Sequence, residues 1–271
     1  MTLRGDVSLP LVCATLSGTT VEDMLADAAR ATAAGADVVE ARLDMLYMQR
    51  VAVEAEQGRD DVKSKAKRTQ TKLVEREAID FEIDEVLSLL EAGIELPVIL
   101  TCRPKRQGGY FPGDEQERCE ILRKAIDSGV SWVDLEMDID EGKRGELASL
   151  ASGKTQVICS EHFDRQPDGN DEVVSRIREM SEFGDLVKLC YKTGGKRSGL
   201  SLFEAAWELK GEGLSYTVMG LGNAGDWTRI HAPVLGIGMV YTTSESDPRE
   251  ASSGKINTTE LITAWEMLDY S

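Results

Sequence analysis

The chain has 271 residues and a formal net charge of −17 at pH 7, because 48 Asp and Glu residues outnumber 31 Lys and Arg residues. Its 41% hydrophobic content is enough for a packed core. No run of about 18 apolar residues is present to span a membrane, and the N-terminus lacks the basic and then apolar pattern of a signal peptide. We therefore expect a cytoplasmic protein without a membrane partner. The acidic balance and the lack of a basic stripe also argue against a nucleic-acid partner.

The excess of carboxylates predicts a dependence on salt. A surface of this charge repels itself in dilute buffer, and the repulsion weakens as the Debye length shrinks to about 3 Å near 1 M salt. We therefore expect a protein from a halophilic organism with a saline cytoplasm. An ordinary acidic enzyme is the alternative.

The five cysteines predict neither a metal site nor a disulfide framework. They have no close pair at metal-ligand or redox spacing, and four of them lie inside apolar runs. We expect buried thiols that behave as small hydrophobic residues, at Cys13, Cys102, Cys119, Cys159 and Cys190.

Eight short apolar runs predict β-strands. They are Leu9 to Thr15, Asp37 to Asp44, Pro97 to Arg103, Trp132 to Asp138, Gln156 to Phe163, Leu186 to Tyr191, Leu214 to Met219 and Val234 to Thr242. Amphipathic segments between the runs predict helices over Val21 to Ala33, Phe81 to Glu91, Glu115 to Asp127, Glu141 to Ala151, Asp171 to Phe183, Leu202 to Leu209 and Thr258 to Leu268. Apolar strands that alternate with helices indicate a parallel sheet covered on its outer face, so we expect an α/β fold, the (β/α)8 TIM barrel. An open doubly wound sheet is disfavoured because its glycine fingerprint is missing after the first strand.

One segment interrupts the even spacing. Residues Met45 to Ala78 are polar and charged, contain no proline and carry Gly58 near their middle. We expect a helical insertion after the second strand, about residues 45–78, beside a single barrel domain that spans residues 1–271. Its lysine run is most simply a solvated face, and otherwise a surface for a partner subunit.

Charged residues at the predicted strand ends are the first candidates for chemistry, because a barrel forms its active site there. Glu40, Arg42 and Asp44 alternate and therefore share one face of the second strand. Inside a barrel these charges must satisfy one another or a ligand, since an unpaired buried charge costs several kcal/mol. A salt-bridge cluster and a binding site both meet this requirement. The alternation of Asp134 and Glu136 adds carboxylates to the same barrel mouth.

Lys188 and His162 are the strongest candidates for catalysis. Lys188 lies in an apolar strand, where desolvation and neighbouring cations are expected to lower its pKa and leave a neutral amine that can attack a carbonyl. Pairing with a nearby carboxylate is the structural alternative. His162 is one of two histidines and lies at the end of the preceding strand, close enough to share a substrate with Lys188. The other histidine, His231, is expected to pack or to cap.

Two arginines and a glycine-rich stretch suggest how an anion is bound. Arg103 and Arg229 are expected in loops over the barrel mouth, where a guanidinium can bind a carboxylate with two parallel hydrogen bonds. The stretch from Met219 to Trp227 resembles a phosphate cradle at a helix start, although glycines at a barrel rim also simply permit tight turns.

Six short motifs, in order along the predicted strands, resemble type I 3-dehydroquinate dehydratase, the Schiff-base enzyme family of the shikimate pathway. They are Glu40-Ala41-Arg42-Leu43-Asp44, Thr101-Cys102-Arg103 with Gly108-Gly109, Asp134-Leu135-Glu136, Ser160-Glu161-His162, Val187-Lys188-Leu189, and Thr228-Arg229 with Gly236. Each motif alone is weak, but six in the right order and strands are specific.

The resemblance implies dehydration of 3-dehydroquinate to 3-dehydroshikimate, a step of chorismate and aromatic amino acid biosynthesis, with no metal or organic cofactor. It implies that Lys188 forms an imine with the ring ketone and that His162 is the general acid and base. The residues implied to bind substrate are Glu40, Arg42 and Arg103 at the hydroxyls and Arg229 at the carboxylate. Because family members are often dimeric, a homodimer is a further expectation.

Two departures from the family pattern bear on the site. Gln107 stands where the family usually has an acid, so carboxylate assistance to His162 must come from elsewhere, and Glu40 is the candidate. The family's Ser-Ala-Pro-Gly-Gln lid segment appears here as Ala251-Ser252-Ser253-Gly254-Lys255. We expect Lys255 to replace the glutamine with a charge-assisted hydrogen bond, and Ser252 or Ser253 to supply the hydroxyl.

Two other functions fit the same residues. A Schiff-base aldolase or transaldolase that acts on sugar phosphates would also use Lys188, with the glycine-rich stretch as its phosphate site. A non-catalytic barrel would keep the charged mouth as structure alone. Arg103 and Arg229 favour a substrate with a planar carboxylate, and His162 favours a dedicated proton carrier, so the dehydratase is the preferred function.

Overall fold

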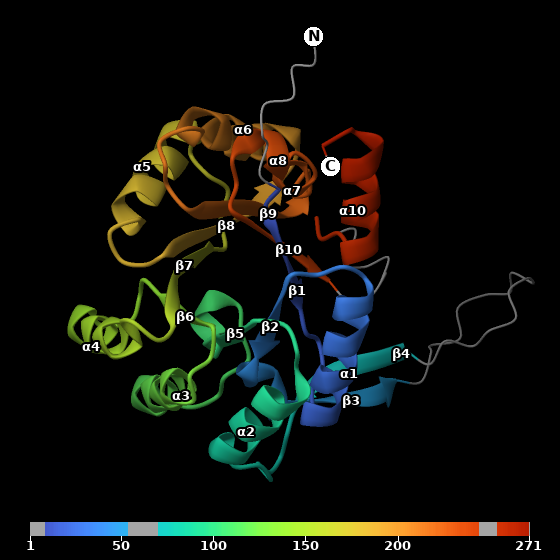
Figure 1. Ribbon diagram of the computed structural model, residues 1–271, viewed down its shortest axis with the longest axis vertical. Coiled ribbons are helices and arrows are strands. Elements are labelled where there is room, and N and C mark those ends of the chain that lie inside the picture. Colours follow the sequence, from blue (N-terminus) through green and yellow to red (C-terminus); the bar gives the residue numbers. More distant parts are fainter. Residues whose placement is uncertain (1–8, 54–69, 244–253, 271) are drawn as a thin grey trace, which may run out of the picture.

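The computed structural model of the protein describes residues 9–53, 70–243 and 254–270. Within them, eight parallel strands form one sheet in the order β10, β1, β2, β5, β6, β7, β8, β9. Their bounds are β1 (Leu11–Thr15), β2 (Val38–Arg42), β5 (Val98–Thr101), β6 (Trp132–Glu136), β7 (Gln156–Phe163), β8 (Leu186–Gly194), β9 (Tyr216–Asn223) and β10 (Met239–Thr243). The N–H of Gly238, just before β10, donates to the carbonyl of Tyr216 in β9 at 2.9 Å, which brings the two edges of the sheet together. The result is the predicted TIM barrel, nearly closed (Figure 1).

Helices cover the outside of the ring of strands (Figure 1). They are α1 (Val21–Ala33), α2 (Ile83–Gly93), α3 (Glu115–Asp127), α4 (Glu141–Ala151), α5 (Asn170–Met180), α6 (Lys196–Leu209), α7 (Trp227–Ile230), α8 (Ala232–Leu235) and α10 (Thr258–Met267). The start of α3 is fixed by a capping box, in which Asp114 accepts from the N–H of Glu117 and the Glu117 side chain accepts from the N–H of Asp114. The last strand begins later than predicted, because residues 232–235 form α8 and Gly236, at φ 73°, ends that helix.

The prediction of a helical insertion after β2 is wrong for the residues that the structure describes. A 3₁₀ turn (Leu43–Tyr47) leads into β3 (Met48–Val53), which pairs antiparallel with β4 (Gln70–Glu75). Both segments carry β-branched residues, two valines in the first and Thr71 and Val74 in the second, which favour a strand over a helix. Residues 54–69, with most of the lysine run, lie outside the described part of the chain.

The hairpin of β3 and β4 lies at the carboxyl end of the barrel. The guanidinium of Arg50 donates to the carbonyl of Ser17 at 3.2 Å, and that of Arg76 donates to the carbonyl of Thr19 at 2.9 Å. Both carbonyls belong to the loop between β1 and α1, beside which Figure 1 shows the hairpin. The insertion therefore extends the rim of the barrel on the side where active sites form.

The barrel interior changes from apolar to charged along the strands. Inward side chains near the amino ends form an apolar layer that includes Cys13, Val38, Ile99, Trp132, Ile158, Leu186 and Met239. Two residues further along the strands, the inward side chains are polar or charged: Thr15, Glu40, Thr101, Asp134, Ser160 and Lys188. Because side chains alternate between the two faces of a strand, both layers share one face. We call the second set the charged layer.

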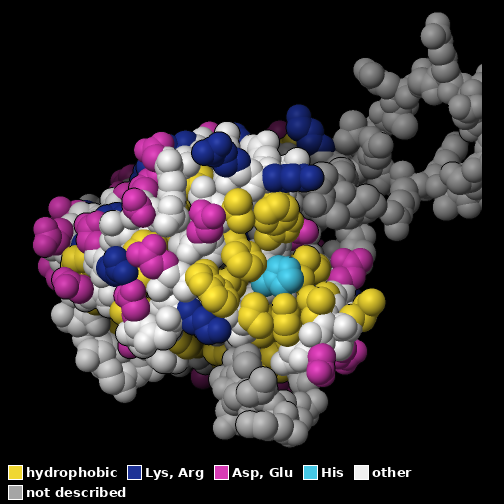
Figure 2. All heavy atoms as spheres, turned by 90° about the horizontal axis from the view of Figure 1, so that it is seen from above, with side chains coloured by type: hydrophobic (Ala, Val, Ile, Leu, Met, Phe, Trp, Pro, Cys, Tyr) yellow, Lys and Arg dark blue, Asp and Glu magenta, His cyan; other side chains and the backbone are white. Residues whose placement is uncertain are grey.

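Among the described residues, no helix has the length and hydrophobicity needed to cross a membrane. On the face drawn in Figure 2, hydrophobic side chains gather around a histidine. His231 caps α7 and packs against the rings of Phe203 and Tyr270, with Nδ1 2.9 Å from the Tyr270 hydroxyl, as its predicted structural role requires. Four of the five cysteines are buried free thiols, and Cys119 is half-buried.

Candidate active site

Lys188, on β8, is the cation of the charged layer. Its Nζ donates to Glu40 Oε1 at 2.8 Å and to Asp134 Oδ2 at 3.2 Å, and it lies 3.9 Å from the centroid of the Tyr241 ring. Burial disfavours the charged amine, but the two carboxylates outweigh burial and raise the pKa of Lys188. The expectation of a lowered pKa is therefore wrong. Lys188 is an ammonium ion at neutral pH, and the structural alternative of a carboxylate-paired lysine describes its surroundings.

Glu40, on β2, is the closest carboxylate to Lys188. Its oxygens also accept hydrogen bonds from the hydroxyls of Thr15 at 2.9 Å and Thr101 at 3.0 Å. Burial alone would raise its pKa, but Lys188 and two arginines lower the pKa of Glu40 to about 2. The oxygens of Glu40 are therefore bound to Lys188 and to two threonine hydroxyls. Among the described residues, Glu40 makes no hydrogen bond to His162, so the prediction that Glu40 assists His162 has no contact to support it.

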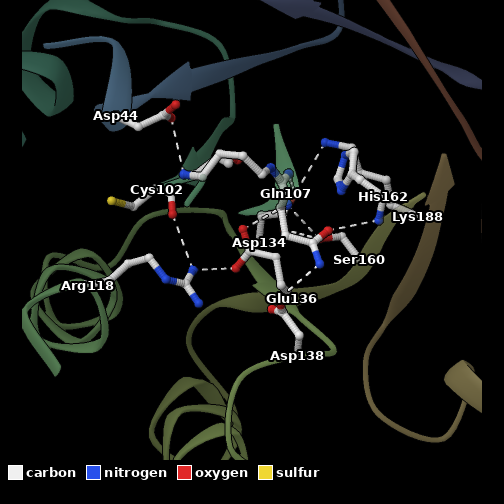
Figure 3. A network of polar contacts seen from close by, with 12 residues as sticks. Asp44, Cys102, Gln107, Arg118, Asp134, Glu136, Asp138, Ser160, His162 and Lys188 are labelled. Atoms are coloured by element: carbon white, nitrogen blue, oxygen red, sulfur yellow. Dashed lines mark hydrogen bonds and ion pairs between the residues drawn. The ribbon is translucent and has the colours of Figure 1, made fainter. Parts of the chain in front are cut away.

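Arg103, two residues after the end of β5, is buried against the charged layer and does not lie in a loop over the mouth as predicted. Its guanidinium donates to Asp134 at 2.6 Å, to Glu136 at 2.8 Å and to the Ser160 hydroxyl at 2.9 Å. Arg118 of α3, which is fully buried, binds the other oxygen of Glu136 (Figure 3). Burial and the neighbouring Asp134 raise the pKa of Glu136 in spite of its two arginines. Two guanidiniums thus hold Asp134, which also binds the Lys188 amine, and its neighbour Glu136.

His162, near the end of β7, lies beside Lys188 (Figure 3). Ser160 is in register with Lys188, and His162 follows two residues later on the same inward face. The backbone N–H of His162 donates to Gln107 Oε1 at 2.9 Å, and Gln107 Nε2 donates to Asp138 at 3.0 Å. The ring Nδ1 is buried without a hydrogen-bond partner among the described residues. Burial and the nearby cations hold the pKa of His162 well below its ordinary value, so the imidazole is neutral at neutral pH.

Arg42 and Asp44 form a separate pair at the end of β2. The Nε and Nη2 atoms of Arg42 donate to the two carboxylate oxygens of Asp44 at 2.7 and 2.6 Å. Asp44 also accepts from the N–H groups of Arg103 and Tyr110 at 3.2 and 3.0 Å. The salt-bridge interpretation therefore holds for Arg42 and Asp44, which tie β2 to the loop after β5, whereas Glu40 belongs to the set around the amine.

Arg229, in α7, is a buried cation that has no carboxylate partner among the described residues. Its guanidinium donates to the carbonyls of Gly220, Gly225 and Gly254 at 2.9, 2.6 and 2.9 Å, and to that of Tyr241 at 3.2 Å. Burial lowers the pKa of Arg229 to about 10, so it still carries its charge at neutral pH. A buried, charged guanidinium whose partners are all neutral is suited to an anionic ligand.

The glycine-rich stretch is explained by its contacts with Arg229. The carbonyls of Gly220 and Gly225 face the guanidinium, and a Cβ on Gly225 would collide with the carbonyl of Gly220. The glycines therefore permit a close approach of two backbone segments around a cation. This contact removes the main observation in favour of a phosphate cradle.

The predicted lid residues lie at the edge of the described chain. Lys255 directly follows Gly254, whose carbonyl contacts Arg229. Ser252 and Ser253 fall outside the described residues, so the role of Ser252 stays a prediction. Within residues 9–53, 70–243 and 254–270, no group of three or more His, Cys, Asp and Glu side chains is arranged to hold a metal ion.

Two residues of the site were missed by sequence reasoning. Tyr241 alternates with Met239 on the last strand, so the period-two rule that found Lys188 also places Tyr241 inward. Arg118 occupies a position on the stripe of α3 that buries Ile121, Leu122 and Ala125, and an arginine on such a stripe signals a buried carboxylate.

Comparisons with known proteins show the family of the chain and agree with its barrel fold. A family model described as Type I 3-dehydroquinase matches residues 12–271. The 3-dehydroquinate dehydratase of Methanocaldococcus jannaschii is 27% identical over 78% of this chain and 96% of its own length, and that of Methanosarcina barkeri is 29% identical over 92% of both chains. The structure of type I 3-dehydroquinate dehydratase from Clostridium difficile superposes with a TM-score of 0.75 at 22% identity, covering 96% of this chain and 92% of that one.

Proposed function

The chain belongs to the type I 3-dehydroquinase family, whose reaction is the dehydration of 3-dehydroquinate in the shikimate pathway, and we propose that it performs this reaction through an imine on Lys188. The single observation that supports the imine is the buried amine of Lys188, held by Glu40 and Asp134 beside a neutral His162. The product is 3-dehydroshikimate, and the enzyme is a carbon–oxygen lyase.

The first step must convert the ammonium of Lys188 into a free amine. His162, neutral and adjacent, is the base that accepts this proton. The amine then adds to the ring ketone, and His162 returns the proton to the carbinolamine oxygen, which leaves as water; a cationic imine and a neutral imidazole result. Glu40 and Asp134 stabilise that cation at the position where they now hold the ammonium.

His162 carries the protons of the elimination. The cationic imine acidifies the adjacent carbon, because it accepts the electron pair that the C–H bond releases. The imidazole removes this proton, then returns it to the hydroxyl that departs as water, and hydrolysis of the imine frees the product and Lys188. Gln107 fixes the backbone of His162 and links it to Asp138, so it positions the base without acting as an acid.

We assign the substrate contacts by charge and position. Arg229 is assigned to the carboxylate, and Glu40 and Arg42 to the ring hydroxyls; the contacts of Lys255 and Ser252 with the substrate stay predictions from the family pattern. Arg103 has both terminal nitrogens bound to Asp134 and Glu136, so its main task is to order the charged layer. A sugar-phosphate aldolase is disfavoured, because the glycine-rich stretch offers carbonyls to Arg229.

Borohydride reduction tests the imine directly. We expect that sodium borohydride, added in high salt with 3-dehydroquinate, inactivates the enzyme and leaves a covalent adduct on the peptide that contains Lys188, as found by mass analysis. Turnover without an adduct would show that the reaction proceeds without an imine. If neither turnover nor adduct appears, a phosphorylated ketose should be tried in the same assay and in thermal protection.

Replacing Arg229 by Met is expected to raise the KM for 3-dehydroquinate about 100-fold, with a smaller effect on kcat, because a charge-assisted pair with the carboxylate is lost. Arg229→Lys should have a KM between those of Arg229→Met and the unaltered enzyme, since it keeps the positive charge but cannot donate two parallel hydrogen bonds to the carboxylate. Steady-state kinetics of both variants, with the exposed Arg197→Met as control, measure the effect. An unchanged KM in Arg229→Met would remove Arg229 from the carboxylate site.

Salt is expected to stabilise the protein, in line with our proposal of a halophilic origin. The unfolding temperature should rise as KCl increases from about 0.1 M to about 1 M, because the Debye length falls from about 10 Å to about 3 Å and screens a net charge of −17. Thermal unfolding in a KCl series, with sucrose as an uncharged control, gives the answer. Full stability and activity in dilute buffer would contradict it.

We further propose a cytoplasmic homodimer of single-domain subunits, with a small-molecule substrate and neither nucleic acid nor membrane as a partner. The acidic charge supports the exclusion of nucleic acid, and the dimer follows from the family resemblance alone. The family requires no metal or cofactor, and all steps above use only side chains of this chain.

A further inference from the structure

Tyr241 is buried against the reactive amine, and neither the family motifs nor the steps above use it. It lies on β10, is 6% exposed, and places its ring centroid 3.9 Å from Lys188 Nζ. Its hydroxyl is buried and has no hydrogen-bond partner among the described residues. The contact that the structure gives Tyr241 with the amine is therefore made by its ring and not by its hydroxyl.

The strand order explains how the ring reaches the amine. β9 lies between β8 and β10, and it carries Thr217 in register with Lys188. Thr217 is short and buried, so the longer side chain of Tyr241 extends past it to the amine. The ring covers one side of Nζ, while Glu40 and Asp134 accept hydrogen bonds on the others.

We propose that Tyr241 is a positioning residue for Lys188, whose ring stabilises the cationic nitrogen first as ammonium and then as the imine. The second part rests on the proposed function, whereas the first does not. An aromatic face attracts a cation through its quadrupole, and the attraction grows where water is excluded. The ring thereby favours a charged nitrogen without adding a third negative charge to the two carboxylates.

Other charged or titratable groups also act on the Lys188 nitrogen, and they must stay constant in a test. From the packed strands these groups are Glu40, Asp134, Arg103, His162, Cys13 and Cys190. Substitution of Tyr241 by an uncharged residue leaves all of them in place. A change in the pKa of Lys188 in such a variant therefore reports on the ring.

The first measurement needs no substrate. Trace labelling with acetic anhydride over a pH series, with mass analysis of the peptide that contains Lys188, gives the pKa of this lysine in the folded protein. We expect Tyr241→Leu to lower that pKa by roughly 1, because the cation loses its aromatic contact, and Tyr241→Phe to leave it within about 0.3. Tyr216→Phe is the matched control, since Tyr216 is buried on β9 with its hydroxyl bound to the carbonyls of Ala206 and Leu235, away from the amine.

The second measurement follows dehydration of 3-dehydroquinate. We expect Tyr241→Leu to lower kcat about tenfold with little change in KM, and Tyr241→Phe to stay within about twofold of the unaltered enzyme. If Tyr241→Leu does not fold by circular dichroism, Tyr241→Met takes its place, because it fills the space without a ring. Rescue by Phe separates an effect of the ring from a loss of packing.

Two results overturn the proposal. One is an unchanged pKa of Lys188 in Tyr241→Leu, and the other is a loss in Tyr241→Phe as large as in Tyr241→Leu, which would assign the effect to the hydroxyl. If the unaltered protein neither turns over nor traps 3-dehydroquinate, the proposed function fails. The labelling result still decides whether the Tyr241 ring raises the pKa of Lys188.

Discussion

Replacing Lys188 by Met is expected to lower kcat for dehydration on the order of 10⁴-fold or more, because the variant loses the amine that is proposed to form the imine. Methionine fills a similar volume but cannot add to a ketone. The variant should also give no adduct with borohydride and 3-dehydroquinate. Its residual turnover is measured by product absorbance at high enzyme concentration.

The same substitution should weaken the fold without abolishing it. Glu40 and Asp134 lose a cation inside the barrel, yet Glu40 keeps two threonine hydroxyls and Asp134 keeps Arg103 and Ser160. We therefore expect a loss of about 2–3 kcal/mol at pH 7, below the range for a buried charge left with no partner.

The pH dependence of that loss has a definite sign. The folded pKa of Glu40 is about 2, below its unfolded value, so its ion pairing stabilises the fold above pH 4–5 and is lost as pH falls toward 2. Lys188→Met lacks the part of this contribution that comes from Lys188 at every pH, and keeps the part from Arg42 and Arg103. The difference in unfolding free energy between the two proteins should therefore shrink as the solution is acidified.

Lys192→Met is the matched control for Lys188→Met. Lys192 lies on the same strand, but its side chain is 60% exposed and pairs with Asp164. Its removal should leave kcat and stability nearly unchanged, as expected for a surface ion pair. Unchanged turnover in Lys188→Met would show that the lysine is only structural and would favour the non-catalytic barrel.

The sequence predicts the barrel and the inward position of Lys188 because both depend on local periodicity. Apolar strands that alternate with amphipathic helices allow few other closed arrangements. Within a strand, the period of two decides which side chains meet, and it brings Glu40, Asp134 and Lys188 to one layer. Distances between side chains on strands that face each other across the barrel do not follow from this rule.

The pKa of Lys188 illustrates what local reasoning cannot reach. Burial lowers the pKa of a lysine and carboxylates raise it, so the sign depends on distances between strands that are far apart in sequence. Glu40 lies 148 positions from Lys188, and only the folded barrel brings their atoms to 2.8 Å. The same limit applies to Arg103, which was expected to face a ligand but instead binds two carboxylates from a neighbouring strand.

The prediction of a helical insertion after β2 was wrong for a different reason. A charged segment without proline suggests a helix by composition, but residues 48–53 and 70–75 carry β-branched residues and pair with each other as strands, which composition alone does not reveal. The position of the lid and the use of Ser252 could not be assigned, because short motifs outside the regular elements have no periodicity to fix their direction.

Replacing Arg118 by Met is expected to destabilise the protein by about 3–5 kcal/mol at pH 7, since it leaves the buried Glu136 with one arginine in place of two. Arg118 is fully buried and also donates to the carbonyl of Cys102 and to Glu115, so no solvent can replace it. Urea unfolding at high salt gives the free energy. Arg123→Met, on the same helix but 41% exposed, should change stability by less than about 0.5 kcal/mol.

The loss in Arg118→Met should depend on pH, and a second substitution should reverse part of it. The folded pKa of Glu136 is already raised, and removal of Arg118 raises it further, so the destabilisation is largest above that pKa and decreases as the carboxyl is protonated. Adding Glu136→Gln removes the unpaired charge and should recover about half of the lost stability. It should not restore turnover, because Arg103 loses the carboxylate that orients it toward Asp134 and, through Asp134, toward Lys188. If Arg118→Met is as stable as the unaltered protein at pH 8, the ionised Glu136 does not need Arg118. Residues inside the barrel would then be sufficient to hold the charged layer.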